Sequence, residues 1–242
     1  MNKYLKNILK FGFRLIDKLA FRKVLVIGDS HAKIFNNPLF KIHFPFYAFD
    51  VCSVKGATAS GLENPNSKTQ AYKIFKEKLD NPQKYFKVIL LLGEVDTGFV
   101  IWYRSEKYDA PISKMFNDAI IKYTNFIADT NKLLQPIVIS TPLPTISDNN
   151  DWGEIANLRK TIKAKQLERT DLTIKFNNKI EKFCKTNNIE YVNLDKQSLG
   201  KNGLIDDYLL NKNSNNHHYN NNNYTKLLIR NLKKILVVKN KL

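Results

Sequence analysis

The residues most able to do chemistry in this chain are one serine near its start and a pair of histidines near its end. Ser30 follows an apolar run within the sequence Gly28-Asp29-Ser30-His31, whereas His217 and His218 precede the last predicted helix. A serine hydroxyl at a tight turn after a strand projects into a cleft, and it becomes a nucleophile when an imidazole takes its proton. Helix capping is the alternative role for Ser30, because serine is common at helix starts.

Glycines close two further apolar runs in the same way. Gly56 follows the second run, and Gly93 follows the third and is itself followed by Glu94-Val95-Asp96. Glycine at such a position allows a tight turn and a close backbone approach. The ends of three runs and one late loop therefore carry the polar residues that a catalytic site would need.

These positions imply a regular alternation of strands and helices. We predict strands over residues 23–27, 47–54, 88–92 and 137–140, with a weaker one over 190–194, and helices over 70–79, 115–134, 172–186 and 224–236. Wholly apolar strands separated by helices indicate a parallel sheet covered on both faces, here a three-layer α/β/α sandwich of about five strands. In such sheets ligands bind beyond the carboxyl ends of the strands.

The order of these residues resembles the SGNH (GDSL-like) hydrolase superfamily, over about residues 23 to 236. The form Gly28-Asp29-Ser30-His31-Ala32 looks like the version in SGNH domains associated with bacterial polysaccharide O-acylation. The resemblance implies a flavodoxin-like fold, Ser30 as nucleophile and Gly56 as an oxyanion-binding group. It favours His218 over His217 as the base, because in the family an apolar residue and a helix follow that histidine.

The sequence departs from the family pattern beside the histidines. The family usually has an acidic residue two or three positions earlier, where this chain has Asn215 and Asn216. An asparagine can accept a hydrogen bond from the imidazole but cannot stabilise the imidazolium by charge. We take Asn215 as the candidate partner, and Asp206 or Asp207 could substitute through space.

A second departure lies in the third block, where the family's oxyanion-binding Asn is replaced by Val95. Losing one such donor typically costs about 10²–10³ in rate. The backbone N–H groups of Ser30 and Gly56 would then hold the oxyanion. Candidate residues around this hole and the substrate are Gly56, Gly93, Asp29, Glu94, Asp96 and Arg104, with Arg104 available to pair with a carboxylate.

The amino-acid composition limits the classes of binding partner that we expect. The 242 residues have a net charge of +17, which favours anionic groups, but no nucleic-acid-binding motif accompanies it. Two cysteines are too few for a disulfide scaffold, no metal-ligand spacing is present, and no cofactor is implied. Residues 1–22 predict a basic amphipathic helix ahead of an α/β domain over 23–242, and this helix could lie on an acidic membrane surface.

No apolar run reaches the roughly 18–20 residues that cross a bilayer, and no signal-peptide pattern is evident, so we expect a cytoplasmic protein or one at the inner face of the membrane. Two long connections, 97–114 and 141–171, are candidate lids or substrate loops. Their aromatic residues could stack on sugar rings or could simply pack; these are Trp102, Tyr103, Tyr108 and Trp152.

The sequence therefore predicts a serine-dependent acyl-transfer enzyme acting on O-acyl groups of a carbohydrate, either an esterase or an O-acetyltransferase. The alternative is a catalytically weakened module that binds an acidic glycan or a sugar phosphate in polysaccharide biosynthesis. The sequence does not set the oligomeric state.

Overall fold

A single parallel sheet organises the chain. The computed structural model describes residues 22–148, 162–213 and 216–238. Within them the strands lie in the order β2-β1-β3-β4-β5, and all neighbours are parallel. Their bounds are β1 (Arg22–Gly28), β2 (Tyr47–Ser53), β3 (Lys87–Leu91), β4 (Pro136–Ile139) and β5 (Glu190–Val192). The predicted parallel sheet of about five strands is confirmed.

The central strands are buried on both faces, which is why their sequences do not alternate between apolar and polar residues. Val24 to Ile27 of β1 and every residue of β3 are buried. A strand that is apolar on both sides requires cover on both sides, and parallel crossovers place helices there. The helices on both faces of the sheet therefore explain why these strands are uninterrupted apolar runs in the sequence.

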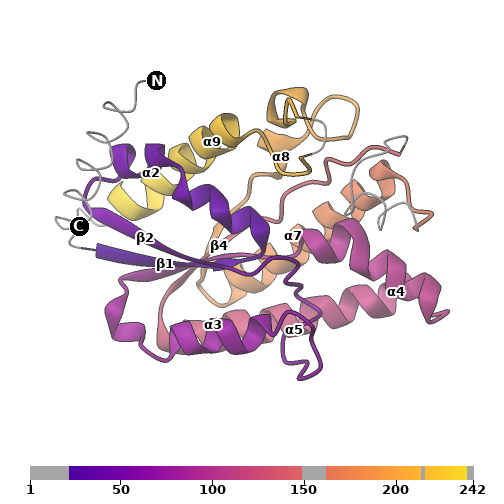
Figure 1. Cartoon of the computed structure of the whole chain (residues 1–242), viewed down its shortest axis with the longest axis horizontal. Coiled ribbons are helices and arrows are strands. Elements are labelled where there is room, and N and C mark those ends of the chain that lie inside the picture. Colours follow the sequence, from indigo (N-terminus) through magenta and orange to yellow (C-terminus); the bar gives the residue numbers. More distant parts are fainter. Residues whose placement is uncertain (1–21, 149–161, 214–215, 239–242) are drawn as a thin grey trace.

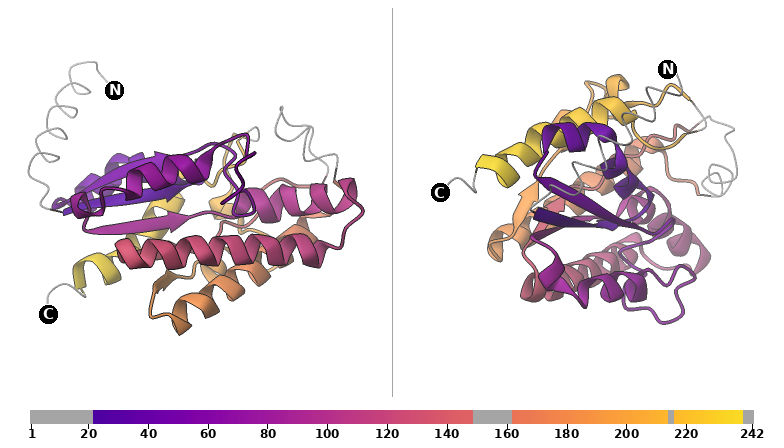
Figure 2. Two further views of the ribbon diagram at one scale, coloured as in Figure 1. Left: turned by 90° about the horizontal axis from the view of Figure 1, so that it is seen from below. Right: turned by 60° about the vertical axis from the view of Figure 1, so that its left-hand side comes forward.

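Two layers of helices enclose the sheet, as Figures 1 and 2 show. One face carries η1 (Ser30–Asn36), α2 (Pro38–His43) and α9 (Asn221–Lys233). The other carries α3 (Ala71–Leu79), α5 (Ile112–Leu133) and α7 (Gln166–Thr186). Phe40 and Leu228 pack in the first of the two cores, and Phe75, Phe126 and Phe176 pack in the second. The predicted three-layer α/β/α sandwich is thus confirmed.

The remaining elements are short and lie in the connections. They are η2 (Pro82–Lys84), the π-helical turn η3 (Asp96–Val100), α4 (Ile101–Lys107), α8 (Asp195–Ser198), η4 (Asp207–Leu209) and the π-helical turn η5 (Lys234–Val238). In the long connection 97–114, η3 and α4 occupy most of the residues, so this candidate substrate loop is largely helical. Trp102 is buried there and its Nε1–H donates to the backbone oxygen of Thr97 at 2.8 Å, so this aromatic ring packs.

The strand order creates a switch point beside β1. This strand pairs with β2 on one side and with β3 on the other, so the chain leaves its carboxyl end in one direction for β2 and returns on the other side for β3. Gly28 is in register with Ser53 and with Leu91. The segments that follow these three residues therefore emerge together, where α/β sheets bind ligands.

Some predictions fall outside the described residues. The helix over 1–22, apart from Arg22, is one, and Asn215 and Trp152 are others. In the described ranges, no helix combines the length and the apolar character that a membrane crossing requires. Cys52 and Cys184 are both buried and form no disulfide.

Candidate active site

The turn after β1 presents Ser30 at the start of η1. Asp29 is the N-cap of this helix, and its Oδ1 accepts the backbone N–H of His31 at 2.8 Å. The hydroxyl of Ser53, at the end of β2, donates to the backbone oxygen of Asp29 at 2.7 Å and ties the turn to the neighbouring strand. The capping role that was the alternative for Ser30 therefore belongs to Asp29.

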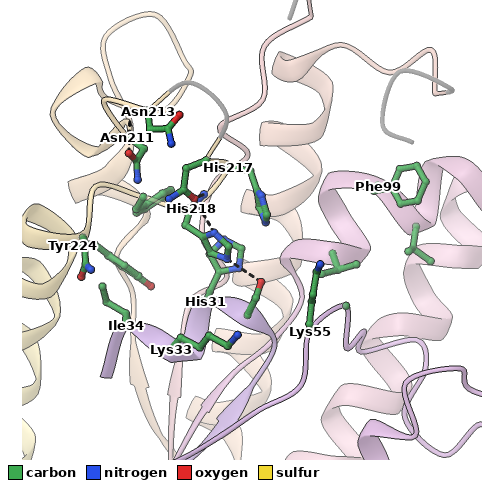
Figure 3. A pocket seen from close by; sticks show the side chains of 17 residues that line it. His31, Lys33, Ile34, Lys55, Phe99, Asn211, Asn213, His217, His218 and Tyr224 are labelled. Carbon is green, nitrogen blue, oxygen red and sulfur yellow. Dashed lines mark hydrogen bonds between the residues drawn. The ribbon is translucent and has the colours of Figure 1, made fainter. Parts of the chain in front are cut away.

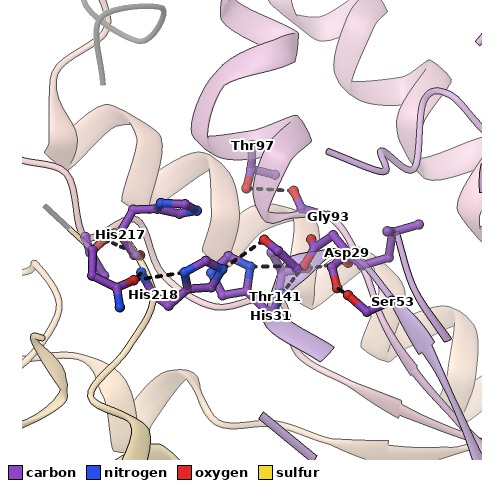
Figure 4. Close-up of polar contacts among 12 residues, drawn as sticks. Asp29, His31, Ser53, Gly93, Thr97, Thr141, His217 and His218 are labelled. Atoms are coloured by element: carbon purple, nitrogen blue, oxygen red, sulfur yellow. Dashed lines mark hydrogen bonds and ion pairs between the residues drawn. The ribbon is translucent and has the colours of Figure 1, made fainter. Parts of the chain in front are cut away.

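His218 meets this serine from the other end of the chain. Its Nε2 lies 2.9 Å from Ser30 Oγ, although 188 positions separate the two residues. The loop that carries His218 is anchored to the loop after β4, because Thr145 Oγ1 donates to the backbone oxygen of His217 at 2.6 Å. Figure 4 shows His218 beside His31, the residue that follows Ser30. The structure thus brings together the predicted nucleophile and the favoured histidine.

Asn216 fixes which nitrogen of His218 faces the serine. The Oδ1 atom of Asn216 lies 3.0 Å from the backbone nitrogen of His218 and 3.0 Å from its Nδ1. A backbone N–H can only donate, so the amide oxygen must point toward it, and Nδ1 must then carry the proton that it donates to the same oxygen. Nε2 is left with its lone pair toward Ser30, which is the tautomer that a general base needs.

The two acids considered as substitutes lie elsewhere. Asp206 is the N-cap of η4, with its side chain accepting the backbone N–H of Tyr208 at 3.1 Å, and Asp207 is exposed. Neither is among the described residues that line the cavity around Ser30. Asn216 is thus the partner of the imidazole in the structure.

The environment of His218 keeps its ring neutral. The pKa of this imidazole is lowered to about 3, first by burial and then by the positive charges that His31, His217 and Lys33 can carry, while the charge of Glu94 acts in the opposite direction. Desolvation disfavours the charged form of a histidine. The ring of His218 is therefore neutral at neutral pH, and an imidazolium formed there would need stabilisation.

Gly56 supplies the turn expected for an oxyanion hole. Its φ is +73°, a left-handed conformation that favours glycine, and the residue lines the cavity together with Ser30. Within the described residues we find no hydrogen bond from the backbone N–H of Ser30 or of Gly56. Both groups are available to an oxygen bound between them.

Solved structures with this architecture are found, although no protein-family model and no curated protein matches the sequence. A GDSL-like lipase from Bacteroides thetaiotaomicron superposes with a TM-score of 0.58 at 16% identity, over 97% of this chain and 98% of that one. The chain has the SGNH hydrolase fold. An acetyl xylan esterase gives 0.56 at 14% identity over 89% and 100% of the two chains. A carbohydrate acetylesterase from Sinorhizobium meliloti gives 0.52 at 12% over 76% and 88%.

Val95 lines the cavity at the position that the SGNH pattern gives to the oxyanion-binding Asn. Its side chain has no donor, so any oxyanion hole here depends on backbone groups. The neighbouring Gly93 has a different task. With φ at +125°, a Cβ added to it would lie 2.6 Å from Thr141 Oγ1 and 2.8 Å from a ring carbon of Phe176, so this glycine lets β3 end against α7.

Asp96 and Arg104 serve the loop after β2 and do not line the cavity in the described part of the chain. The carboxylate of Asp96 is fully buried and accepts the backbone N–H groups of Ala59 at 2.6 Å and Ser60 at 3.0 Å. Arg104 Nη1 donates to Ser60 Oγ at 3.1 Å. Burial raises the pKa of Asp96 to about 6, although these amides and the nearby Arg104 charge oppose the rise. Both residues are therefore connected to the cavity through this loop, which also carries Gly56.

Glu94 and Asp29 are likewise buried and absent from the cavity lining in the described ranges. Glu94 lies between Gly93 and the lining residue Val95, and its charge reaches His218. Asp29 holds His31 instead, through a contact of 3.0 Å between Oδ1 and Nδ1. Of these two predicted acids, Glu94 therefore acts on His218 by its charge, and Asp29 contacts the lining residue His31.

Ser30 lines a cavity of about 870 Å³, whose side chains are drawn in Figure 3. It is lined by Ser30, His31, Lys33, Ile34, Lys55, Gly56, Val95, Phe99, Val100, Asn211, Asn213, Asn216, His217, His218, Tyr219, Asn221 and Tyr224. Lys33 and Lys55 lie below the histidines in this view, and Asn211 and Asn213 lie above them. Its described lining holds two lysines and four asparagines but no carboxylate.

The sequence analysis missed several of these lining residues. Lys33 could have been found from its place three residues after Ser30 on a short helix. Phe99, Asn211 and Asn213 carry no such signal, because only the fold brings η3 and the loop before α9 together. Among the described residues, no group of three or more His, Cys, Asp or Glu side chains could hold a metal ion.

Proposed function

We propose that this protein is a serine-dependent acyl hydrolase that cleaves O-acyl esters. One observation carries the proposal: the 2.9 Å contact between Ser30 Oγ and His218 Nε2, with Nδ1 of the same ring held by Asn216. This arrangement is the geometry of a nucleophile, a base and an orienting group. The SGNH fold supports it, because Ser30, Gly56 and His218 occupy the positions that the sequence resemblance implies.

The chemistry proceeds in two balanced halves. Ser30 Oγ forms a bond to the acyl carbon while its proton passes to His218 Nε2 and the carbonyl electron pair moves to the oxygen. The N–H groups of Ser30 and Gly56 stabilise this oxyanion. The bond to the alcohol oxygen then breaks, and the alcohol takes the proton from Nε2. Water repeats the sequence on the acyl-enzyme and releases the carboxylic acid and free Ser30.

The substrate we favour is an O-acetylated or similarly acylated carbohydrate. The cavity, at about 870 Å³, is far larger than an acetyl group and leaves room for a sugar unit. Its asparagine side chains offer both donors and acceptors, which suit sugar hydroxyl groups. Two proteins of the same fold are named an acetyl xylan esterase and a carbohydrate acetylesterase. Transfer to a glycan hydroxyl would use the same acyl-enzyme, with that hydroxyl in place of water.

A binding module for an acidic glycan or a sugar phosphate is the second candidate. The observation that favours it is the cationic lining, with Lys33 and Lys55 beside the serine, together with the absence of a charged partner for His218 at position 216. Such a protein would retain the cavity and lose the turnover.

Labelling with a fluorophosphonate separates the two candidates, since this reagent reacts only with activated serines. We expect the wild type to be labelled, Ser30→Ala to be unlabelled and His218→Gln to be labelled at least about 100-fold more slowly. Ser113→Ala is the matched control, because Ser113 is an exposed serine of α5. Hydrolysis of p-nitrophenyl acetate should follow the same order. A wild type that is not labelled between pH 6 and 9 would favour the binding module.

A further inference from the structure

Two copies of one local motif meet at Ser30. In the first, Asp29 Oδ1 accepts the backbone N–H of His31 at 2.8 Å and lies 3.0 Å from its Nδ1. In the second, Asn216 Oδ1 makes the same two contacts with His218, both at 3.0 Å. Each motif is an Asx turn that holds the imidazole two residues later. They differ in that one has a carboxylate where the other has an amide.

The two imidazoles lie against each other. The ring centroids of His31 and His218 are 4.6 Å apart, with the planes tilted by 50° (Figure 4). Ser30 is the middle residue of the first motif and is the hydrogen-bond partner of the histidine in the second. The pair behind it is enclosed, with His31 4% and Asp29 1% exposed. Packing of this kind restricts the rotation of the His218 ring.

The chemistry proposed above creates a positive charge on His218 that Asn216 cannot balance. In a buried site a charge acts over several ångströms, because little water screens it. The ionisable groups that act on His218 are His31, His217 and Lys33, which disfavour its protonation, and Glu94, which favours it. Asp29 contacts the first of these groups, because its Oδ1 lies 3.0 Å from Nδ1 of His31 and its negative charge opposes the charge that a proton would bring to that ring.

We propose that Asp29 and His31 form a positioning pair that orients His218 and supplies, through His31, the negative charge that most serine triads place directly beside the base. The inference rests on the proposed function. It assigns a role to the histidine that follows the nucleophile, and it explains how an asparagine can stand at position 216 without loss of the catalytic cycle.

The chain allows the charge to be moved from one motif to the other. Asp29→Asn keeps an Oδ1 acceptor for both contacts with His31, as Asn216 shows for His218, and removes only the charge. We expect kcat for p-nitrophenyl acetate to fall about 10- to 100-fold, with KM and the melting temperature nearly unchanged. Adding Asn216→Asp should recover most of the loss, because the carboxylate then contacts the base directly.

The pH profile distinguishes this role from a structural one. Asn216→Asp alone should raise the midpoint pH of the acid limb of kcat/KM. Adding Asp29→Asn should lower that midpoint again, since one negative charge is lost. His31→Gln should lower kcat without removing fluorophosphonate labelling. Asp206→Asn is the matched control, because Asp206 caps η4 by the same side-chain contact and does not line the cavity in the described ranges. It should change neither kcat nor the acid limb.

Two results would overturn the inference while leaving the enzyme in place. The first is that Asp29→Asn alone has the wild-type kcat, and that adding it to Asn216→Asp leaves the midpoint pH of the acid limb unchanged. The second is a slow Asp29→Asn enzyme that Asn216→Asp does not recover, which would indicate a structural role. A wild type without Ser30-dependent hydrolysis would remove the proposed function and this inference with it.

Discussion

At the scale of single residues, the amide of Asn216 accomplishes part of what an aspartate does. Its oxygen is held by the backbone N–H of His218, so the amide cannot turn its NH₂ group toward the ring without leaving a donor facing a donor. Replacing a triad aspartate by asparagine is damaging when it yields the wrong tautomer. Here the local backbone removes that problem, and only the missing charge remains.

The acid limb of the kcat/KM profile should therefore have its midpoint at an unusually low pH. The pKa of His218 is lowered to about 3, mainly by burial, so the base form persists when the pH falls below the ordinary histidine value. We expect kcat/KM for p-nitrophenyl acetate to stay level from pH 8 to about pH 5. Stopped-flow assays that avoid acid unfolding would check this, and a midpoint near 6.5 would contradict it.

Val95 offers a gain-of-function test at the oxyanion hole. An asparagine there could donate its amide N–H to the developing oxyanion, a contact worth about 10²–10³ in rate when removed from other enzymes. Val95→Asn should raise kcat, by about tenfold or more if the side chain adopts the needed rotamer. Val95→Ala is the control for the change in size. A turnover equal to or below that of Val95→Ala would show that the oxyanion lies elsewhere.

The pairing of Ser30 with His218 could be predicted from sequence because both residues stand next to strong local signals. Ser30 follows an apolar strand and a glycine, and His218 precedes an amphipathic helix. The partner of the base could not be fixed in the same way. Asn215 and Asn216 are identical in type, and which amide reaches the ring depends on the conformation of a loop that no periodicity specifies.

At the scale of elements, Asp96 joins the loop after β3 to the loop after β2. Its buried carboxylate holds Ala59 and Ser60 by their N–H groups, and Lys122 Nζ donates to the backbone oxygen of Ser60 at 3.0 Å. The same loop begins with Gly56. The position of Gly56, the proposed oxyanion donor, therefore depends on a carboxylate that does not line the cavity in the described part of the chain.

Asp96→Asn should loosen this connection, because an amide NH₂ would face a backbone N–H. We expect kcat/KM to fall about tenfold while the contact between Ser30 and His218 is preserved, so that His218 still titrates as in the wild type. The rate of fluorophosphonate labelling would check the loss of activity, and proton NMR of the imidazole would check the titration of His218. Asp118→Asn, on exposed α5 surface, is the control. An equal loss in that variant would contradict the loop argument.

Strands and long helices were predictable at this scale, whereas the short helices were not. The strands are uninterrupted apolar runs that end at turn residues, and α3, α5, α7 and α9 have a helical spacing of apolar residues. The segment 97–114 lacks such spacing and has Gly98 as its second residue, yet η3 and α4 form there. Their stability comes from packing, since Ile101 and Trp102 are buried against the rest of the fold, and packing outweighs local propensity in short helices.

At the scale of the whole molecule, the net charge of +17 and the cavity lining have the same sign. Lys33 and Lys55 line the cavity, and no carboxylate lines it in the described part of the chain. Field lines from like charges are focused in a cleft, which raises the local concentration of anions there. An ester that carries a negative charge on its alcohol part should therefore be cleaved more efficiently than its neutral counterpart.

A matched pair of esters tests this without a change in the acyl group. 4-Acetoxybenzoate is anionic and methyl 4-acetoxybenzoate is neutral, and both release acetate. We expect kcat/KM for the anionic ester to be higher relative to non-enzymatic hydrolysis, and to fall about three- to tenfold as salt rises from roughly 50 to 500 mM, while the neutral ester changes little. Lys33→Gln and Lys55→Gln should each reduce this preference, whereas Lys114→Gln on the exposed surface of α5 should not. Equal rates for the two esters at low salt would mean that the charge of the molecule is spread too evenly to select a substrate.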